Sequence, residues 1–196
     1  MEKKKSGILE SFQFLWIHQK YIRYLIATIF LWITDMLLYN AMSLISTSLA
    51  GDAYLNYLFS GIIEIPAYTF IPLLINRIGC KKFVIIVHIF TAAALFPILF
   101  IQPDFQIIYI TFWLLGKLGA AVGIVSLFVY GAEIFPTNIR STCLGTAAFF
   151  GNIGGMISVQ TQYLKQINPI FPAAFYSFMS FTAGIITLFL PETVHV

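Results

Sequence analysis

Charged side chains are scarce in this sequence. Of its 196 residues, 10% are Asp, Glu, Lys or Arg, whereas 59% are hydrophobic and the mean hydropathy is +0.88. A soluble domain carries about 25% charged residues, so this chain has too few charges to cover a surface that faces water. The composition excludes a soluble globular domain and indicates an integral membrane protein whose surroundings are the lipid bilayer.

Cysteine pairs and metal-binding patterns are also missing from the sequence. Cys80 and Cys143 are too few for a disulfide framework, and the three histidines show no ligand spacing. No phosphate-binding loop and no nucleophile elbow occurs. We therefore expect no metal, no cofactor, no enzymatic activity and no nucleic-acid partner.

Long apolar segments make up most of the chain. Each is close to the roughly 20 residues that cross about 30 Å of hydrocarbon, and short polar links separate them, so neighbours should run antiparallel. The sequence predicts an all-α membrane protein with six transmembrane helices, at about 22–46, 55–75, 83–101, 107–130, 141–163 and 171–190.

The few basic residues lie mostly on one side of this arrangement. Lys165 falls in a link on the opposite side, and Lys117 falls inside a span. The other lysines and arginines precede the first span or lie in the second and fourth links: Lys3, Lys4, Lys5, Lys20, Arg23, Arg77, Lys81, Lys82 and Arg140. Because Lys and Arg concentrate in cytoplasmic loops, we expect both termini in the cytoplasm.

The two ends of the chain lie outside the predicted spans. Residues 1–21 have apolar side chains at helical spacing behind a run of lysines, which fits a helix on the inner membrane surface. A solvated cytoplasmic linker fits these residues equally well. Residues 191–196 form a short cytoplasmic tail.

A polar turn at residues 131–140 lies between two long apolar segments. Pro136 cannot continue a helix, because it lacks an N–H and clashes with the preceding turn. Glu133 and Arg140 should then flank the turn from opposite sides, close enough to pair. The spacing Glu-x-Phe-Pro-Thr-x-x-Arg resembles the link between the tenth and eleventh spans of major facilitator transporters, particularly the organic cation, organic anion and carnitine carriers.

Further patches resemble the same carriers and follow in the same order. Together they cover the chain from about Ser11 to Thr193 and resemble the carboxy-terminal six-helix half of such a carrier. The matching patches are Gly51–Asn56, Ser60–Tyr68, Arg77–Gly79 with Lys81, Gly116–Gly119 and the Pro191-Glu192-Thr193 sequence after the last span.

The resemblance implies transport of a small organic ion across the plasma membrane by alternating access, with an organic cation or a carnitine-like zwitterion as substrate. A sugar-porter-like facilitator is the alternative carrier. The family has two six-helix halves, and the sequence resembles one. Three explanations stay open: a fragment of a longer product, a half that pairs with a second copy or another protein, or a truncated membrane subunit that does not transport.

The resemblance also implies a conformational switch in the inner loops. In the family, charges there hold the two halves together in one state. Asn76 and Cys80 replace an acidic and a basic residue of the family pattern, which weakens this charge clasp. The residues that match the switch loops are Arg77, Gly79, Lys81, Glu133 and Arg140.

Polar residues inside the predicted spans are the candidates for a substrate site, because each costs a few kcal/mol to place in hydrocarbon. With a rise of about 1.5 Å per residue, Asp35, Glu64, Lys117 and Asn152 all fall near the middle of the membrane, where transporter sites lie. The family position at Asn152 is often charged, so an amide there leaves the substrate charge open.

Aromatic residues accompany these polar residues. Glu64 shares a helix face with Tyr68, and a carboxylate beside aromatic rings suits an organic cation. Lys117 fits either a substrate carboxylate or a counter-ion for Asp35 or Glu64. The predicted substrate-binding residues are Glu64, Lys117, Asn152, Asp35, Tyr39, Tyr68 and Phe149, with packing as the alternative role for Tyr39 and Phe149.

Overall fold

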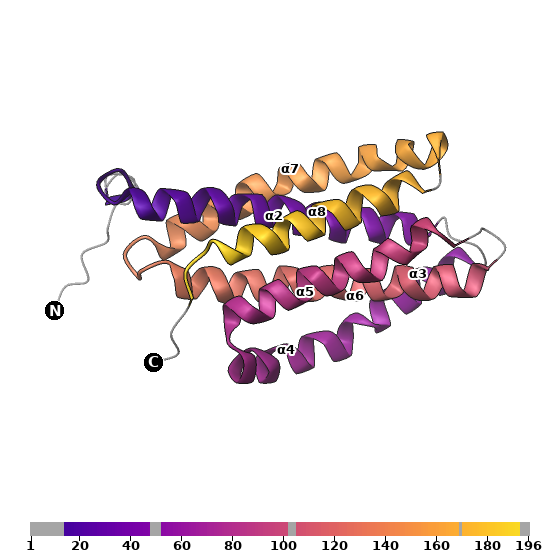
Figure 1. Cartoon of the computed structure of the whole chain (residues 1–196), viewed down its shortest axis with the longest axis horizontal. Helices are drawn as coiled ribbons and strands as arrows, with labels where there is room; N and C mark the ends of the chain where they lie inside the picture. The colour runs from indigo at the N-terminus through magenta and orange to yellow at the C-terminus, as the bar shows by residue number, and fades with distance from the viewer. Residues whose placement is uncertain (1–13, 48–51, 102–104, 169, 193–196) are drawn as a thin grey trace.

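The computed structural model of the protein describes residues 14–47, 52–101, 105–168 and 170–192. Within these ranges all regular secondary structure is helical, which confirms the predicted all-α class. The elements are α2 (Gln19–Ser46), α3 (Ala53–Ile62), α4 (Glu64–Ile78), α5 (Cys80–Leu95), the short 3-10 helix η1 (Phe96–Leu99), α6 (Gln106–Ile134), α7 (Arg140–Ile167) and α8 (Phe171–Leu188). Figure 1 shows them as an elongated bundle of antiparallel helices.

Five helices of the described chain are long and apolar enough to cross a membrane: 19–46, 80–99, 106–134, 140–164 and 171–188. The segment that we expected as one helix at 55–75 is instead two helices, α3 and α4, which meet at Ile63. Pro66 has no N–H for the Ile62 carbonyl, so the helical hydrogen-bond ladder is interrupted there. The positions of the membrane boundaries stay predictions.

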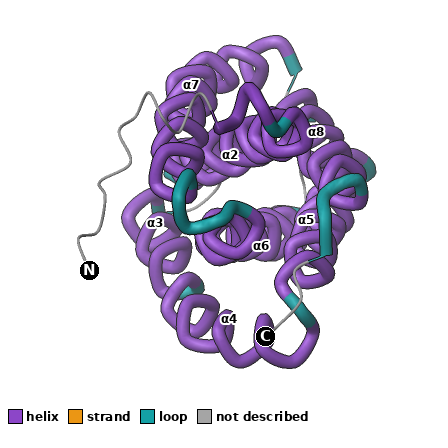
Figure 2. The backbone as a smooth tube through the Cα atoms, turned by 90° about the vertical axis from the view of Figure 1, so that its left-hand side faces the viewer, coloured by secondary structure: helices purple, strands orange, loops and turns teal. Residues whose placement is uncertain are grey.

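Helix packing places α6 inside the bundle. α2 packs along α7 and also contacts α6, while α5 lies against both α6 and α8. α4 packs on α6, and the end-on view in Figure 2 shows α4 and α2 on opposite sides of α6. Side chains of α2, α4 and α6 can therefore meet around the α6 backbone.

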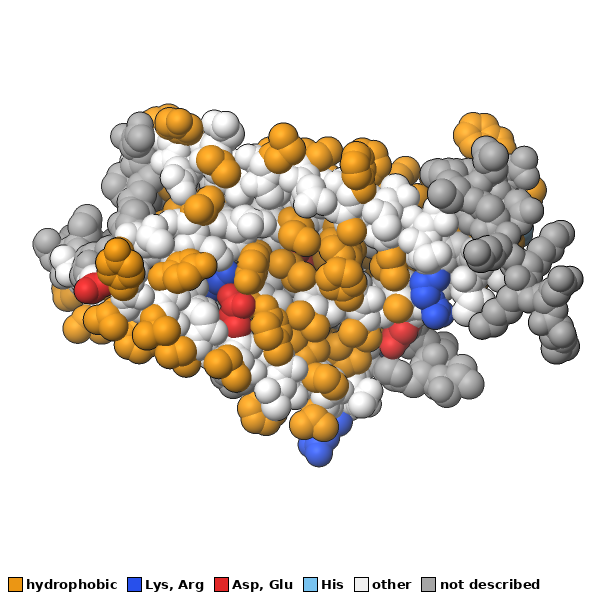
Figure 3. Space-filling model, turned by 180° about the vertical axis from the view of Figure 1, so that it is seen from behind, with side chains coloured by type: hydrophobic (Ala, Val, Ile, Leu, Met, Phe, Trp, Pro, Cys, Tyr) orange, Lys and Arg blue, Asp and Glu red, His pale blue; other side chains and the backbone are white. Residues whose placement is uncertain are grey.

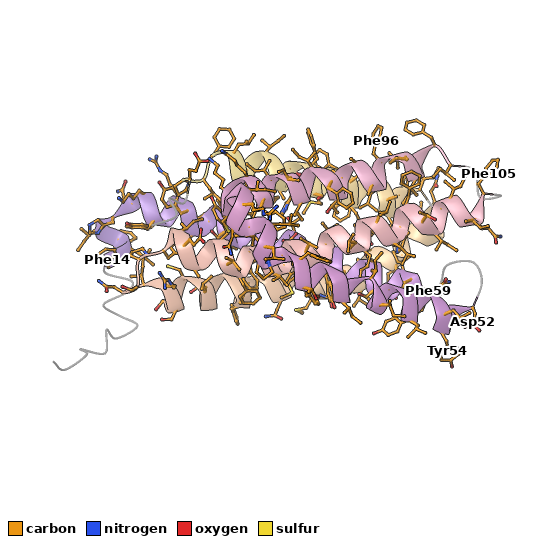
Figure 4. All side chains as sticks on the ribbon, turned by 90° about the horizontal axis from the view of Figure 1, so that it is seen from below. Phe14, Asp52, Tyr54, Phe59, Phe96 and Phe105 are labelled. Carbon is orange, nitrogen blue, oxygen red and sulfur yellow. The ribbon has the colours of Figure 1, made fainter. Side chains whose placement is uncertain are left out.

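The predicted cytoplasmic segments come together at one end of the bundle. Lys81 Nζ donates to the Leu188 carbonyl at 3.0 Å, and the Tyr130 hydroxyl donates to the Pro191 carbonyl at 2.8 Å. The start of α5 thus lies beside the ends of α6 and α8. Figure 4 labels Phe14 at one end of the molecule, with Asp52 at the other.

The turn between α6 and α7 differs from its prediction. Among the described residues, Glu133 and Arg140 form no ion pair, so the expected pairing is wrong. Arg140 Nε instead donates to the Phe135 carbonyl at 3.3 Å and folds back over the turn. Glu133 is still part of α6 and lies near the Cys80 thiol.

Gly79 joins α4 to α5 in a backbone conformation that is strained for any residue with a side chain. Its φ is 91° and its ψ is 144°, and it is the one residue of the described chain with a positive φ. A side chain there costs of order 1–3 kcal/mol.

We expect Gly79→Ala to lower the midpoint of thermal unfolding in detergent by several degrees. Gly61→Ala is the control, because nothing lies within 4 Å of a Cβ added there; equal losses in the two variants would contradict the role of φ.

Candidate functional site

Lys117 lies in the interior of the bundle, on α6, and is 1% exposed. Its ammonium lies 3.1 Å from Glu64 Oε1, donates to the Tyr39 backbone carbonyl at 3.3 Å and donates to the Ser43 hydroxyl. The same nitrogen lies 3.3 Å from the centroid of the Tyr39 ring. A carboxylate, two further oxygens and a ring face thus take the place of water around the ammonium.

Glu64 is the first residue of α4, directly after the interruption at Ile63. The break therefore gives the carboxylate a helix N-terminus, where a negative charge is favoured by the helix dipole. The hydroxyls of Tyr39 and Tyr68 both donate to Glu64 Oε2, at 3.2 Å and 2.9 Å. Together with Lys117, these bonds join α2, α4 and α6 at one carboxylate.

Exposure differs between the two members of the ion pair. The Glu64 side chain is 14% exposed and that of Lys117 is 2% exposed, so Lys117 lies behind Glu64 as seen from the surface. Tyr68 is 42% exposed beside them. Figure 3 shows an acidic side chain next to a basic one in the middle of a largely hydrophobic face. The cluster of Tyr39, Glu64, Tyr68 and Lys117, hereafter the ion-pair cluster, is thus open on one side.

The structure brings four of the seven predicted site residues into this cluster. Asn152 and Phe149 lie elsewhere, on exposed positions of α7, and Phe149 is 70% exposed. The Asn152 amide donates to the Ala148 carbonyl of its own helix at 2.9 Å. A role of Asn152 and Phe149 in substrate binding stays a prediction, because the structure does not bring them to the ion-pair cluster.

Asp35 is the seventh predicted residue, and it does not pair with Lys117. Its Oδ1 lies 3.6 Å from Nε2 of His88 on α5, and both residues are 2% exposed. Sequence reasoning missed His88 because it looked only for metal-ligand spacing. The available signal was an ionisable side chain inside a predicted span, which is expensive unless it has a role.

The predicted switch residues lie near the end of the bundle where the described chain begins, at Phe14, and ends, at Glu192. Arg77 is in the last turn of α4, Gly79 follows it, and Lys81 bonds the end of α8. Glu133 is in the last turn of α6, and Arg140 begins α7. Their grouping at one end agrees with a role in the inner loops, which stays a prediction.

Comparison with known proteins gives the family. The family model described as sugar (and other) transporter matches residues 1–196. The chain is 33% identical over 181 residues to a Caenorhabditis elegans transporter, B0252.3, covering 92% of this chain and 37% of the relative. It is 31% identical over 169 residues to solute carrier family 22 member 4 of Mus musculus, covering 86% of this chain and 30% of the relative. It is also 27% identical over 164 residues to the organic cation transporter protein of Drosophila melanogaster, covering 84% and 30%.

The chain spans about a third of the length of these relatives. Apolar helices of membrane-crossing length and relatives that are transporters make it part of an integral, multi-pass membrane protein. The helical bundle agrees with one half of the major facilitator fold. The chain therefore belongs to the sugar (and other) transporter family of the major facilitator superfamily, and within it the chain is similar to solute carrier family 22 and organic cation transporter proteins.

Proposed function

We propose that the protein containing this chain moves small organic ions across the plasma membrane by alternating access, and that the ion-pair cluster is this chain's part of the substrate site. The observation that carries the proposal is the Glu64–Lys117 pair at 3.1 Å, held by two tyrosines inside a largely apolar bundle. Buried ion pairs are weak devices for stability. We therefore infer that this pair is retained for transport rather than for stability.

The geometry favours a cation as the substrate. An ion that enters from the open side meets Tyr68 and Glu64 first, because Lys117 lies behind the carboxylate. The exposed ring of Tyr68 offers a face to an ammonium group, and the Glu64 carboxylate offers a counter-charge. A zwitterion would place its cationic group in the same position and would need Lys117 to turn toward its carboxylate.

A second helical half completes the site in this proposal. The open side of the cluster is continuous with exposed apolar residues of α3 and α4, among them Phe59, Ile65 and Phe70. Such residues face either lipid or another protein part. The second half comes from the same polypeptide or from a partner protein. Both ends of the half described above lie in the cytoplasm in this proposal, because Lys and Arg concentrate at one end of its bundle.

Uptake measurements with the full-length protein test the proposed function. Cells that express it should accumulate radiolabelled tetraethylammonium more than carnitine, and more than an aromatic anion or glucose. Glu64→Gln should reduce tetraethylammonium uptake at least about tenfold per molecule at the cell surface, since a charged hydrogen bond is worth about 1.5–3 kcal/mol. The amide oxygen of Gln can still accept from Lys117 but carries no charge, so surface expression should also fall, though by less than uptake does. Unchanged uptake would remove Glu64 from the site, and uptake of glucose alone would favour the sugar porter.

Tyr68→Phe should have a smaller effect on the same assay. It removes the hydroxyl that donates to Glu64 at 2.9 Å but keeps the ring. We expect a severalfold higher KM for tetraethylammonium with an unchanged unfolding midpoint. Tyr54→Phe is the matched control, because Tyr54 is 88% exposed and lies at the start of α3. A KM that moves equally in both variants would contradict the role of Tyr68.

A further inference from the structure

A second pair of ionisable side chains lies inside the bundle, apart from the ion-pair cluster. Asp35 on α2 and His88 on α5 are both 2% exposed, and their nearest atoms, Oδ1 and Nε2, are 3.6 Å apart. This distance is too long for a hydrogen bond. Asp35 Oδ2 and His88 Nε2 have no other hydrogen-bond partner. Trp32 Nε1 and Thr34 Oγ1 of α2 are also buried without a partner. Buried polar atoms without partners are rare in folded proteins, and each needs an explanation, such as a bound water, a ligand or a change of state.

Gly123 leaves room for the Asp35 carboxyl group, but no basic side chain of the described residues besides His88 lies close enough to balance a negative charge on it. A Cβ at Gly123 of α6 would lie 2.9 Å from Asp35 Oδ2, so any larger residue would push the carboxyl group aside. No cation other than His88 lies within ion-pair distance of Asp35 in the part of the chain that the structure describes. An ionised carboxylate in this position would be a buried charge without compensation, which is strongly disfavoured.

Other ionisable groups on the helices around the pair are engaged elsewhere. Lys117 of α6 binds Glu64 of α4, and Tyr176 of α8 shares a hydrogen bond with Thr161 of α7. Tyr130 of α6 donates to the backbone. The remaining ionisable residues described on these helices, together with Asp52 at the start of α3, lie in the ion-pair cluster, on α3 or toward the helix ends: Lys20, Tyr21, Arg23, Tyr24, Tyr39, Asp52, Tyr54, Tyr57, Tyr68, Arg77, Cys80, Lys81, Lys82, Tyr109, Glu133, Arg140, Cys143 and Tyr163.

The contacts of the His88 ring indicate which of its two nitrogens carries the hydrogen. One ring nitrogen faces the Val84 carbonyl, one helical turn earlier on α5. Because Nε2 is without a hydrogen-bond partner, the nitrogen that faces Val84 is Nδ1. A carbonyl only accepts, so Nδ1 carries the hydrogen, and in the neutral ring Nε2 presents a lone pair to Asp35. Two acceptors that face each other need one proton between them.

We propose that Asp35 and His88 hold one exchangeable proton and form a proton-binding site of the carrier. The step is a proton transfer without electron movement: a hydronium ion in water admitted to the site gives its proton to Asp35 Oδ1 and becomes water, and the proton returns to a water molecule as hydronium when the site opens again. Bound, it leaves the pair neutral overall. Released, it leaves one negative charge beside Gly123, which disfavours the closed packing of α2, α5 and α6.

The position of the pair connects it to the ion-pair cluster. Tyr39 and Ser43, which both contact Lys117, follow Asp35 by one and two turns of α2. A movement of α2 that accompanies protonation would therefore displace the contacts of Lys117. Coupling of proton binding to substrate movement rests on the proposed function, whereas the existence of the proton site does not.

Infrared titration of the full-length protein in lipid nanodiscs tests the proton site without any substrate. At neutral pH the protein should show the stretching band of a protonated carboxyl group, which Asp35→Asn removes. Asp52→Asn is the matched control, because Asp52 is exposed at the start of α3 and Asn caps a helix equally well. His88→Gln should shift the band, because the carboxyl group loses its partner. If the band is missing, survives in Asp35→Asn or stays in place in His88→Gln, the proton site is refuted.

Proteoliposomes with an internal pH indicator test the coupling. Tetraethylammonium uptake should move protons in the wild type, and Asp35→Asn should lose the proton signal while tetraethylammonium exchange continues. Uptake without proton movement, together with a carboxyl band, overturns the coupling and leaves the transport proposal intact. If no probe is transported at all, the proposed function fails, and the infrared titration still decides whether Asp35 and His88 bind a proton.

Discussion

Lys117→Met should reduce uptake of tetraethylammonium by at least about tenfold and should lower the amount of folded protein. The substitution removes the ion pair with Glu64, two hydrogen bonds to α2 and the contact with the Tyr39 ring. Breaking a buried pair from one side costs about 3–5 kcal/mol, because the other charge stays without compensation. The partial exposure of Glu64 should place the loss toward the lower end of that range. Uptake and thermal unfolding of the purified protein measure the two effects.

The double variant Glu64→Gln/Lys117→Met separates these effects. With both charges removed, no uncompensated charge is left in the bundle, so the unfolding midpoint should rise above that of Lys117→Met, while uptake stays low. Lys82→Met is the control for loss of a lysine, since its pair with Glu192 is 3.6 Å apart and largely exposed and such pairs contribute little. A double variant that is no more stable than Lys117→Met would show that the pair is not coupled in folding.

Gly154→Ala should prevent the chain from folding into this bundle. A Cβ at Gly154 of α7 would lie 2.0 Å from the backbone oxygen of Ile33 on α2. Overpacking a core costs about 1–3 kcal/mol when side chains can move aside. Here the contacted atom belongs to the backbone of a helix, so α2 and α7 would have to separate along their shared contact. We expect the variant to lose its monodisperse peak in detergent size-exclusion chromatography.

Gly145→Ala is the matched control on the same helix, because nothing lies within 4 Å of a Cβ added there. Alanine is the better helix former, so this variant should elute as the wild type does, or be slightly more stable. A Gly154→Ala protein that folds and unfolds like Gly145→Ala would contradict the close contact of α2 with α7.

Much of the architecture is readable from the sequence, because apolar runs separated by short polar links leave few arrangements. The segment at 55–75, predicted as one span, is divided into two helices for a local reason. Hydropathy is insensitive to a single missing N–H, so the segment looks like one span although Pro66 opens the backbone ladder at Ile63. The same break gives Glu64 its helix N-terminus, which no hydropathy pattern indicates.

The sequence predicts the members of the candidate site where their depth along each helix is enough to bring them together. Glu64 and Lys117 fall at similar depths and do pair, and Tyr68 follows Glu64 by one turn. The partner of Asp35 was not predictable in the same way. His88 reaches it across the bundle, and depth alone does not say which helices face each other. The pairing of Glu133 with Arg140 was wrongly predicted for a similar reason. Sequence spacing does not give the direction of the turn, which places Arg140 against the Phe135 carbonyl.

Reactivity of a cysteine placed at Tyr68 tests the central claim most directly, namely that the ion-pair cluster lines a water-filled substrate path. The native Cys80 and Cys143 are both 0% exposed, so background labelling should be low. Tyr68→Cys should react with a membrane-impermeant thiosulfonate, and tetraethylammonium should slow that reaction. Phe181→Cys on α8, which replaces a residue that is 52% exposed, should react only with a lipid-soluble maleimide. If Tyr68→Cys behaves like Phe181→Cys, or if tetraethylammonium leaves its rate unchanged, the cluster faces lipid and is not the substrate site.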